Sequence, residues 1–365
     1  MKINILLPYK EKFDETKASS VSITVRNNLY YSKYLNQINI FGQKVENPLF
    51  KGNFIGLNHS ILSFQSKNRF LASKMIKIIS KETDKKQLIE IHNRPYLVNQ
   101  IAKEKKFPIS LFFHNNPQEM KGSKSIRERE NILEKCSAIF CVSDFIKKKF
   151  LEGISKNSQK VHVLYNGVER KLKRPPKKKK EILFVGRLVY EKGVHYYVEA
   201  VKAIAPKYLD WSFGLIGSVK LGDNLNKNLY SEKIIKEMND IGSQAQFYGF
   251  RDQEFVNEKM KSASIIVIPS IWEEPFGLVA AEAMSNAACI IASEVGGIPE
   301  IIKDNGILIK DLNLKKLSSM MNNLIKNNEL RKSYQILAWK NFELSSKTTS
   351  KKLDCFRQII YKNFF

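Results

Sequence analysis

The 365-residue sequence contains no hydrophobic run long enough to cross a membrane, since a membrane helix needs about 20 consecutive apolar residues. The apolar stretch within the opening residues, MKINILLPYK, is too short for the core of a signal peptide and is more typical of a first strand. The cysteines Cys136, Cys141, Cys289 and Cys355 form no CxxC pair and have no metal-ligand spacing with histidine. We therefore expect buried thiols in a reducing cytoplasm.

Several motifs that mark other nucleotide-dependent enzymes are absent as well. There is no GxxxxGK[ST] phosphate loop and no GxGxxG fingerprint, which argues against an NTPase or a dehydrogenase. There is also no DxD motif, whose carboxylates would bind Mg²⁺ in a metal-dependent transferase. We therefore expect no metal and no cofactor, and we expect basic side chains and helix amides to stabilise any bound phosphate.

Acidic residues are scarce relative to basic ones, because 36 Asp and Glu stand against 61 Lys and Arg, for a net charge of +25. An AT-rich genome would raise the content of Lys, Asn and Ile, but it does not explain why the content of Asp and Glu is not raised as well. The balance favours attraction to an anionic partner, either a membrane surface or a nucleic acid. A helix over Lys67–Lys81, with lysines along one side, fits both a membrane surface and an ordinary solvated face.

Short apolar segments alternate with polar, helix-like segments along the whole chain, which predicts an α/β fold with two parallel sheets flanked by helices. The expected strands are Ile3–Leu7, Ile38–Phe41, Leu88–Ile91, Ile109–Phe113, Ala138–Val142, Val161–Leu164, Ile182–Val185, Trp211–Ile216, Ala245–Tyr248, Ser264–Ile268, Cys289–Ala292 and Ile307–Ile309. The charged, proline-containing stretch Lys171–Lys180 is typical of a solvated linker. We expect domains over residues 1–170 and 171–345, with 346–365 a C-terminal helix that packs back on the first domain or remains peripheral.

The most informative stretch for function is Ser264–Glu300. A buried strand is followed by a loop that contains Glu274 and by a helix of small residues that contains Glu282. The first amides of that helix, over Gly277–Val279, form an anion site of the kind found at helix N-termini. Carboxylates suit sugar hydroxyls and free amides suit phosphate, so the pattern predicts a pocket for a nucleotide-sugar.

A second segment, Gly186–Gly193 with the sequence GRLVYEKG, follows a strand and precedes a helix. Its cations, Arg187 and Lys192, are sufficient to neutralise much of a diphosphate. Polar residues also follow strands in the first half of the chain, among them His92 and His114. Because ligands of open parallel sheets bind beyond the carboxyl ends of the strands, these positions are candidate site residues.

Three segments closely resemble glycosyltransferase family 4, both in sequence and in their order and spacing along the chain. They are GRLVYEKG at Gly186–Gly193, IPSIWEEPFGLVAAEAM at Ile268–Met284 and VGGIPEII at Val295–Ile302. The resemblance implies the GT-B fold, with two Rossmann-like domains and an active site in the interdomain cleft. It also implies retaining transfer from a sugar nucleotide. It covers the second domain almost completely. In the first domain, HNRP at His92–Pro95 and LFFHN at Leu111–Asn115 resemble members that build lipopolysaccharide and other surface polysaccharides.

The resemblance also implies roles for individual residues. Arg187 and Lys192 would bind the diphosphate, and Glu282 would bind the ribose hydroxyls. The donor sugar would be contacted by Glu274 and by the catalytic histidine His114, with His92 as the rival candidate. The main-chain amides of the donor site would come from Phe276, Gly277 and Leu278. One departure from the family is Lys17–Ser20, which replaces the glycine-rich loop expected after the first strand.

The sequence therefore predicts a metal-independent retaining glycosyltransferase that moves a hexose from a nucleotide-diphosphate sugar, with UDP favoured, to a glycan or lipid-linked acceptor. We expect it in the cytoplasm, with peripheral attachment to the inner face of the membrane. One alternative is a non-catalytic protein that binds an anionic polymer such as nucleic acid, but this would not explain why Glu274 and Glu282 flank an anion site. The other alternative is a GT-B epimerase of sugar nucleotides. The linkage, the acceptor and the oligomeric state are left open.

Overall fold

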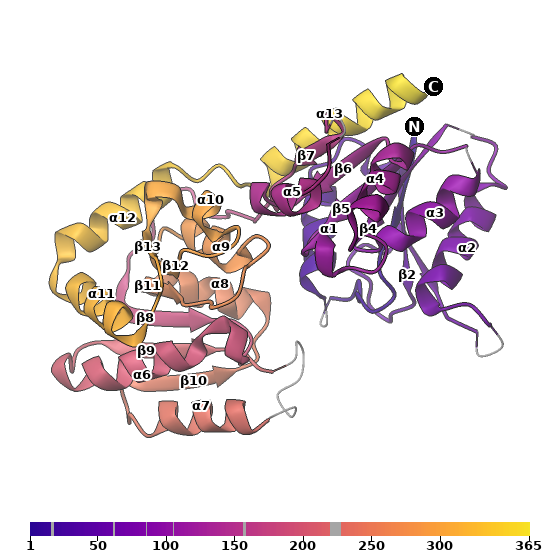
Figure 1. Ribbon diagram of the computed structural model, residues 1–365. Helices are drawn as coiled ribbons and strands as arrows, with labels where there is room; N and C mark the ends of the chain where they lie inside the picture. Colours follow the sequence, from indigo (N-terminus) through magenta and orange to yellow (C-terminus); the bar gives the residue numbers. More distant parts are fainter. Residues whose placement is uncertain (16–17, 61–62, 85, 105, 156–157, 220–227) are drawn as a thin grey trace. The chain divides into compact units, whose positions relative to one another are not determined.

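The computed structural model describes residues 1–15, 18–60, 63–84, 86–104, 106–155, 158–219 and 228–365. It divides the chain into two compact units, which are drawn in Figure 1 and described separately. Unit 1 comprises Met1–Gly167 together with Ser346–Phe365, and unit 2 comprises Val168–Ser345. Lys17, part of the segment expected to replace a glycine-rich loop, lies outside the described residues.

Unit 1 is built on a parallel sheet of seven strands in the order β3-β2-β1-β4-β5-β6-β7. The strands are β1 (Lys2–Leu6), β2 (Ile38–Gln43), β3 (Phe54–Leu57), β4 (Gln87–His92), β5 (Ile109–Phe113), β6 (Ala138–Cys141) and β7 (Val161–Val163). The central residues of β1, β2, β4, β5 and β6 are mostly buried, as expected when helices cover both faces of a sheet. The strand order reverses between β1 and β4, and open α/β sheets bind ligands at such a point.

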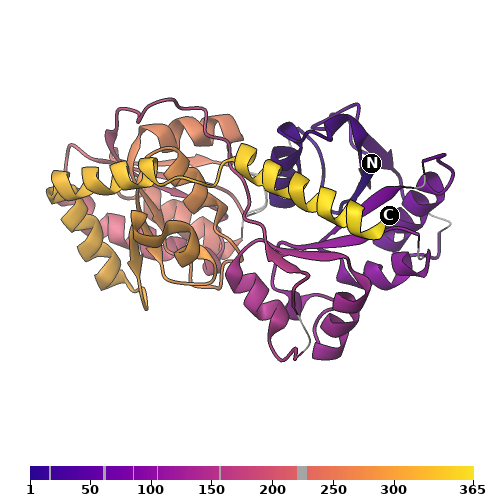
Figure 2. The same cartoon turned by 90° about the horizontal axis from the view of Figure 1, so that it is seen from above.

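The helices of unit 1 lie on both faces of this sheet (Figure 1). One face is covered by α1 (Ser20–Tyr30) and by α13 (Ser346–Phe364), which contact each other. Figure 2 shows α13, in yellow, lying across the strands of unit 1. The other helices of unit 1 are α2 (Lys67–Ile79), α3 (Val98–Ile101), α4 (Ile126–Lys135) and α5 (Asp144–Leu151).

A buried ion-pair network joins α13 to the sheet. Arg357 donates to both carboxylate oxygens of Glu90 on β4, at 2.7 and 2.8 Å, and to Asp354 at 3.0 Å. The Arg357 side chain is 2% exposed. Burial alone would lower the pKa of Arg357, but the two carboxylates outweigh burial and raise the pKa. Asp354 also accepts hydrogen bonds from Ser32 and from the Lys33 amide, so the network fixes the end of α1 as well.

Unit 2 is built on a parallel sheet of six strands in the order β10-β9-β8-β11-β12-β13. The strands are β8 (Lys179–Val185), β9 (Ser212–Ile216), β10 (Ala245–Gly249), β11 (Ala263–Ile268), β12 (Cys289–Ser293) and β13 (Ile307–Ile309). The order reverses between β8 and β11, which are hydrogen-bonded neighbours. Their carboxyl ends therefore form the switch point at which this topology predicts a ligand.

The helices of unit 2 also cover both faces of its sheet (Figure 1). One face is covered by α6 (Val194–Ile204), α7 (Leu229–Asn239) and α11 (Leu314–Lys326), which pack together over the main apolar core. The other helices are α8 (Gln253–Ser262), α9 (Leu278–Ser285), α10 (Ile298–Ile302) and α12 (Asn328–Lys340). Of these, α8, α9 and α12 contact β8, β11 or β12.

Each strand expected from the sequence is present, with bounds shifted by three residues at most, and one further strand, β3, was not predicted. The interpretation of Lys171–Lys180 as a solvated linker is wrong for the last three residues of that segment. Residues Lys179 and Lys180 begin β8, and the ammonium of Lys178 donates to the carbonyls of Met260, Lys261 and Asn286. Burial lowers the pKa of Lys178 to about 7.

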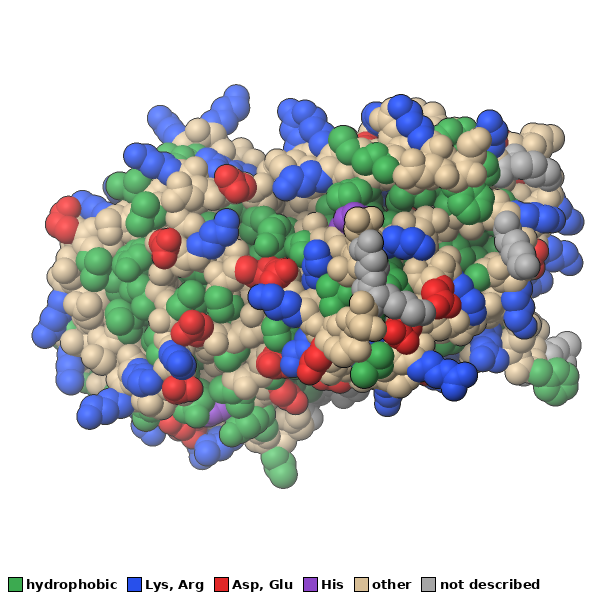
Figure 3. Space-filling view, turned by 45° about the horizontal axis from the view of Figure 1, so that its top comes forward, with side chains coloured by type: hydrophobic (Ala, Val, Ile, Leu, Met, Phe, Trp, Pro, Cys, Tyr) green, Lys and Arg blue, Asp and Glu red, His purple; other side chains and the backbone are tan. Residues whose placement is uncertain are grey.

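The cysteine prediction is confirmed for Cys136, Cys141 and Cys289, which are buried, and is wrong for Cys355, which is exposed on α13. Burial raises the pKa of the Cys136 thiol to about 12. In the part of the chain that the structure describes, no helix is both long enough and apolar enough to cross a bilayer. On the face shown in Figure 3, Lys and Arg side chains are spread over the surface and interspersed with Asp and Glu.

The Arg357 network generates a stability prediction. Arg357→Ala leaves Glu90 buried without its cation, and breaking a buried pair in this way costs about 3–5 kcal/mol. We expect a large fall in the denaturant midpoint of the transition that reports on unit 1. The control is Lys362→Ala, which removes an exposed cation from the same helix and should leave the midpoint unchanged. Equal midpoints for the two variants would contradict a stabilising role for the network.

Candidate active site

The candidate site of unit 2 is formed by the loops that follow β8 and β11, on either side of the switch point. After β8, the chain continues through Gly186 and Arg187 to the short 3₁₀ helix Tyr190–Lys192. After β11, it continues through Ser270 and Glu274 to α9. Both segments contribute residues that the sequence predicted to bind a donor, and the neighbouring positions of β8 and β11 bring them together.

The first loop packs directly against the second. Gly193 begins α6 with a φ of 62°, and a Cβ atom there would lie 1.8 Å from the carbonyl oxygen of Pro269. Only glycine tolerates this combination of positive φ and close approach. The Ile271 amide donates to the Glu191 carbonyl at 3.0 Å. The position of Lys192 relative to the second loop is therefore set by the backbone.

Glu274 is the most buried acid of the site, with 9% of its side chain exposed. Its Oε1 accepts a hydrogen bond from Ser270 Oγ at 2.7 Å and forms an ion pair with Lys192 Nζ. The ammonium also lies 5.5 Å from the centre of the Trp272 ring. The pair is partly buried, so Lys192 and Glu274 position each other as well as any ligand.

The backbone of Glu274 is fixed by the loop that follows β12. Gly296 has a φ of 56°, and a Cβ atom there would lie 2.3 Å from the Glu274 carbonyl oxygen. The Gly297 amide donates to that same oxygen at 2.7 Å. Sequence reasoning recognised this glycine pair only as part of a motif. The structure shows that the pair allows two loops to meet at Glu274.

The N-terminus of α9 presents free amides, as the sequence predicted. Gly277 begins the helix with a φ of 95°, and no side chain caps it. Among the described residues, no group accepts a hydrogen bond from the Leu278 or Val279 amide. Unpaired amides at a helix N-terminus bind anions, and the helix dipole favours negative charge there. The Phe276 side chain is 3% exposed, so it packs into the core.

Arg187 and Glu282 are positioned differently from Lys192 and Glu274. Arg187 is exposed and makes no hydrogen bond or ion pair with the residues that the structure describes. Glu282, half-buried on α9, accepts a hydrogen bond from Gln253 at 3.0 Å. The structure thus joins two of the four predicted charged residues in one ion pair. It leaves the guanidinium of Arg187 available for a ligand.

In unit 1, the two candidate histidines form a buried pair. His92, the last residue of β4, lies with its Nδ1 2.9 Å from Nε2 of His114, which follows β5. Their rings stack with centroids 5.1 Å apart, and His92 also stacks on Phe112 at 4.4 Å. The His114 amide donates to Asn93 Oδ1 at 2.9 Å, and Asn93 has a φ of 52°. Sequence reasoning treated the histidines as rivals, whereas they act on each other.

In this hydrogen bond one ring nitrogen donates and the other accepts, so the two imidazoles cannot both be doubly protonated. Burial lowers the pKa of His114 to about 4. Burial, followed by the charges of His114 and Arg357, lowers the pKa of His92 well below its ordinary value. The pair is therefore neutral at pH 7. Nε2 of His92 is buried and makes no hydrogen bond to the described residues.

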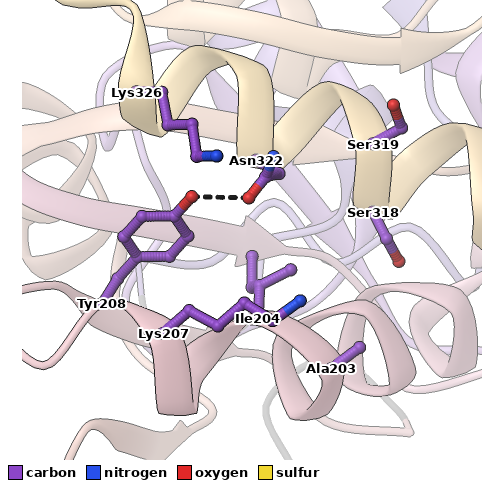
Figure 4. Close-up of a pocket in the computed structure, with 8 residues that line it drawn as sticks. All are labelled: Ala203, Ile204, Lys207, Tyr208, Ser318, Ser319, Asn322 and Lys326. Atoms are coloured by element: carbon purple, nitrogen blue, oxygen red, sulfur yellow. Dashed lines mark hydrogen bonds between the residues drawn. The ribbon is translucent and has the colours of Figure 1, made fainter.

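Two hollows of the described surface lie apart from these loops. One, of about 460 Å³, is lined by residues from the end of α6 and from α11 (Figure 4). Figure 4 shows a hydrogen bond between Tyr208 and Asn322 beside the lysines Lys207 and Lys326. The other lies in unit 1. Among the described residues, no three His, Cys, Asp or Glu side chains converge as a metal site would require.

The histidine pair generates a pH prediction. Unfolded histidine has a pKa of about 6.5, so between pH 6.5 and 4 the unfolded chain binds a proton that His114 in the folded chain does not. The stability of unit 1 should therefore fall as the pH falls through this window, by about 3 kcal/mol at most for His114. Denaturant midpoints measured from pH 7.5 to 4.5 test this, with His114→Asn expected to give a shallower decline. If stability declines equally steeply in that variant, the decline cannot be assigned to protonation of His114.

Two family models match the chain in succession. Glycosyltransferase Family 4 matches residues 37–172, and Glycosyl transferases group 1 matches residues 167–338. An uncharacterized glycosyltransferase of Methanocaldococcus jannaschii is 34% identical over 197 residues, which are 53% of this chain and 51% of that protein. Spore coat protein SA of Bacillus subtilis is 27% identical over 67% of this chain and 70% of its own length.

Solved structures share the fold at low identity. Anabaena HepE in complex with UDP has a TM-score of 0.75 and 16% identity, over 98% of this chain and all of that one. Sucrose-phosphate synthase from Thermosynechococcus elongatus has a TM-score of 0.79 and 16% identity, over 99% of both chains. The predicted α/β fold class, GT-B with two Rossmann-like parallel sheets, is confirmed. With both family models matched in order over residues 37–338, the chain belongs to the group 1 and family 4 glycosyltransferases.

Proposed function

We propose that this glycosyltransferase moves a hexose from a UDP-sugar to a hydroxyl group of a glycan or lipid-linked acceptor, with retention of configuration and without a metal ion. The observation that supports this most is the charge arrangement at the switch point of unit 2. There, an unpaired guanidinium, an ion-paired ammonium and two unpaired helix amides lie on loops that close approaches fix to one another.

In the proposed reaction, the bond between the anomeric carbon and the diphosphate oxygen breaks while a bond to the acceptor oxygen forms. The leaving diphosphate gains negative charge, which Arg187, Lys192 and the amides of Leu278 and Val279 would stabilise. Preorganised donors of this kind are worth most when they are already fixed before the reaction. The acceptor proton passes to a leaving phosphate oxygen on the same face of the sugar. Retention therefore needs no separate protein base.

The carboxylates would bind the sugars of the donor. Glu274, fixed by Ser270 and Lys192, would accept hydrogen bonds from hydroxyls of the transferred hexose. Glu282, with Gln253 beside it, would accept from the ribose hydroxyls. His114 stays our proposed catalytic histidine, and His92 would set its tautomer through the 2.9 Å hydrogen bond. UDP as the nucleotide is supported by the complexes of Anabaena HepE with UDP and with UDP-glucose.

We also propose a role in surface-polysaccharide or lipopolysaccharide synthesis, at the cytoplasmic face of the membrane. The net charge of +25 favours anionic lipid. On α2, Lys67, Lys74 and Lys77 are exposed, whereas the apolar residues of the helix are buried or half-buried. Contact of α2 with a membrane would therefore be electrostatic, with little apolar insertion, and would weaken as salt is added.

Nucleotide binding tests the proposal. A ligand that binds only the folded state raises the melting temperature, so UDP should stabilise the protein more than GDP or ADP. Arg187→Ala should keep the ligand-free melting temperature, because this side chain has no partner in the described structure. It should weaken UDP binding by about ten- to a hundredfold, the worth of a charged hydrogen bond.

The matched control is Arg174→Ala, which removes an exposed arginine from the segment before β8 and should bind UDP normally. Absence of stabilisation by any of the three nucleotides, or normal UDP binding by Arg187→Ala, would overturn the donor site. Product analysis then tests the reaction itself. Transfer to an acceptor supports the proposal, and release of an altered free sugar would indicate an epimerase instead.

A further inference from the structure

A hollow of about 680 Å³ lies at the surface of unit 1, remote in sequence from the donor loops. Its lining comes from the start of α2, from the segment after β4 that includes Tyr96, and from Lys121 after β5. In a parallel sheet, these connections begin at the carboxyl ends of the strands, the edge at which α/β sheets bind ligands. A volume of this size is typical of a small-molecule site.

The lining is strongly basic. Arg69, Lys103 and Lys121 line the hollow, and no Asp or Glu is among the described residues that line it. All three cations are exposed, and none makes an ion pair or a side-chain hydrogen bond with the residues that the structure describes. Three like charges around one hollow repel one another, so an anion bound between them would relieve that repulsion.

The backbone around these cations is ordered. Gly122 has a φ of 90°, and a Cβ atom there would lie 2.6 Å from Cα of Tyr96, so only glycine fits. Ser123, fully buried, donates to the Pro117 carbonyl at 2.6 Å and closes the loop that contains Lys121. The Lys121 ammonium lies 5.8 Å from the centre of the Tyr96 ring. Lys121 is thus fixed at the hollow by its loop.

The start of α2 is also tied to its neighbour. Gln100 on α3 donates to the Arg69 carbonyl at 3.2 Å and to Ser73 Oγ at 2.9 Å. The helix α2, which presents Arg69, is therefore linked by side-chain hydrogen bonds to α3, and Lys103 lies in the 3₁₀ turn directly after α3. Phe64, whose side chain is fully exposed, completes one side of the lining. The hollow thus combines three cations on an ordered backbone with an aromatic group.

The hollow of unit 2 in Figure 4 provides a contrast. It too has two lysines, Lys207 and Lys326, but it is formed by the ends of α6 and α11. Helices that follow parallel strands end at the opposite edge from the one where ligands bind. Two of its polar groups also satisfy each other, since Tyr208 donates to Asn322 at 2.5 Å. This hollow therefore serves as a comparison rather than as a candidate.

We propose that the hollow of unit 1 binds a phosphate or diphosphate group of the acceptor. This inference rests on the proposed function, because it names the chemical class of the acceptor in that reaction. The phosphate could belong to a lipid diphosphate that bears the growing glycan or to a phosphorylated glycan. Both sources offer the same oxyanion to Arg69, Lys103 and Lys121.

The test uses the full chain saturated with UDP, so that the donor site is filled. Methylenediphosphonate, a diphosphate that resists hydrolysis, is then titrated and its binding followed by calorimetry. We expect saturable binding that Arg69→Ala/Lys121→Ala weakens at least tenfold. The control Lys207→Ala/Lys326→Ala removes two cations from the other hollow and should bind the probe normally. Both double variants should retain UDP binding, which shows that they are folded.

Geranyl diphosphate, titrated in the same way, distinguishes the two sources. Tighter binding than methylenediphosphonate indicates a lipid diphosphate, and equal binding indicates a phosphorylated glycan; both support the site. The proposal is overturned if neither probe binds the UDP-saturated protein, or if both double variants weaken binding equally. If the unmodified chain does not bind UDP, the proposed function is contradicted. Binding of the diphosphate probes at the hollow of unit 1 is a separate result, which that outcome does not decide.

Discussion

The ion pair between Lys192 and Glu274 is the interaction on which the candidate donor site depends. It joins the loop after β8 to the loop after β11, and it places a cation and an acid at the switch point of the sheet. Two further contacts converge on Glu274, from Ser270 and from the backbone of Gly297. The side chain and the main chain of Glu274 are therefore both held in place.

The cations of this protein thus fall into two kinds. Lys192, partly buried, and Arg357, fully buried, pair with carboxylates and order the structure around them. Arg187 and the three cations around the hollow of unit 1 are exposed and form no ion pair with the residues that the structure describes. Unpaired cations at the carboxyl edge of a parallel sheet are the ones available to a phosphate. In each unit, the positive charge of the sequence thus includes cations that hold the fold together and cations that are available to an anionic ligand.

Much of the fold could be predicted from the sequence, because strands buried on both faces appear as short runs of Ile, Val, Leu and Phe. The missed strand, β3, is an edge strand of four half-buried residues that includes Gly56, so it has no such run. Lys178 was assigned to a solvated linker because its neighbours are charged. Only the tertiary structure shows the three carbonyls that surround its ammonium.

The candidate site was predictable in its residue types but not in its contacts. The free amides of Leu278 and Val279 follow from a glycine before a helix, which is a local signal. The Lys192–Glu274 pair spans 82 residues and depends on β8 and β11 being neighbours, which no local pattern encodes. The pairing of His92 with His114 likewise requires that β4 and β5 be adjacent. The glycine pair at Gly296 was visible as a motif, but its approach to Glu274 was not.

The amide resonances of Leu278 and Val279 test the central claim most directly. In an isotope-labelled full chain titrated with UDP, these two amides should shift strongly, because a phosphate oxygen accepts their free hydrogen bonds. The first amides of α12, which begins directly after the end of α11, should remain unchanged. If UDP binds while the Leu278 and Val279 resonances stay in place, the diphosphate lies elsewhere and the account of the donor site is wrong.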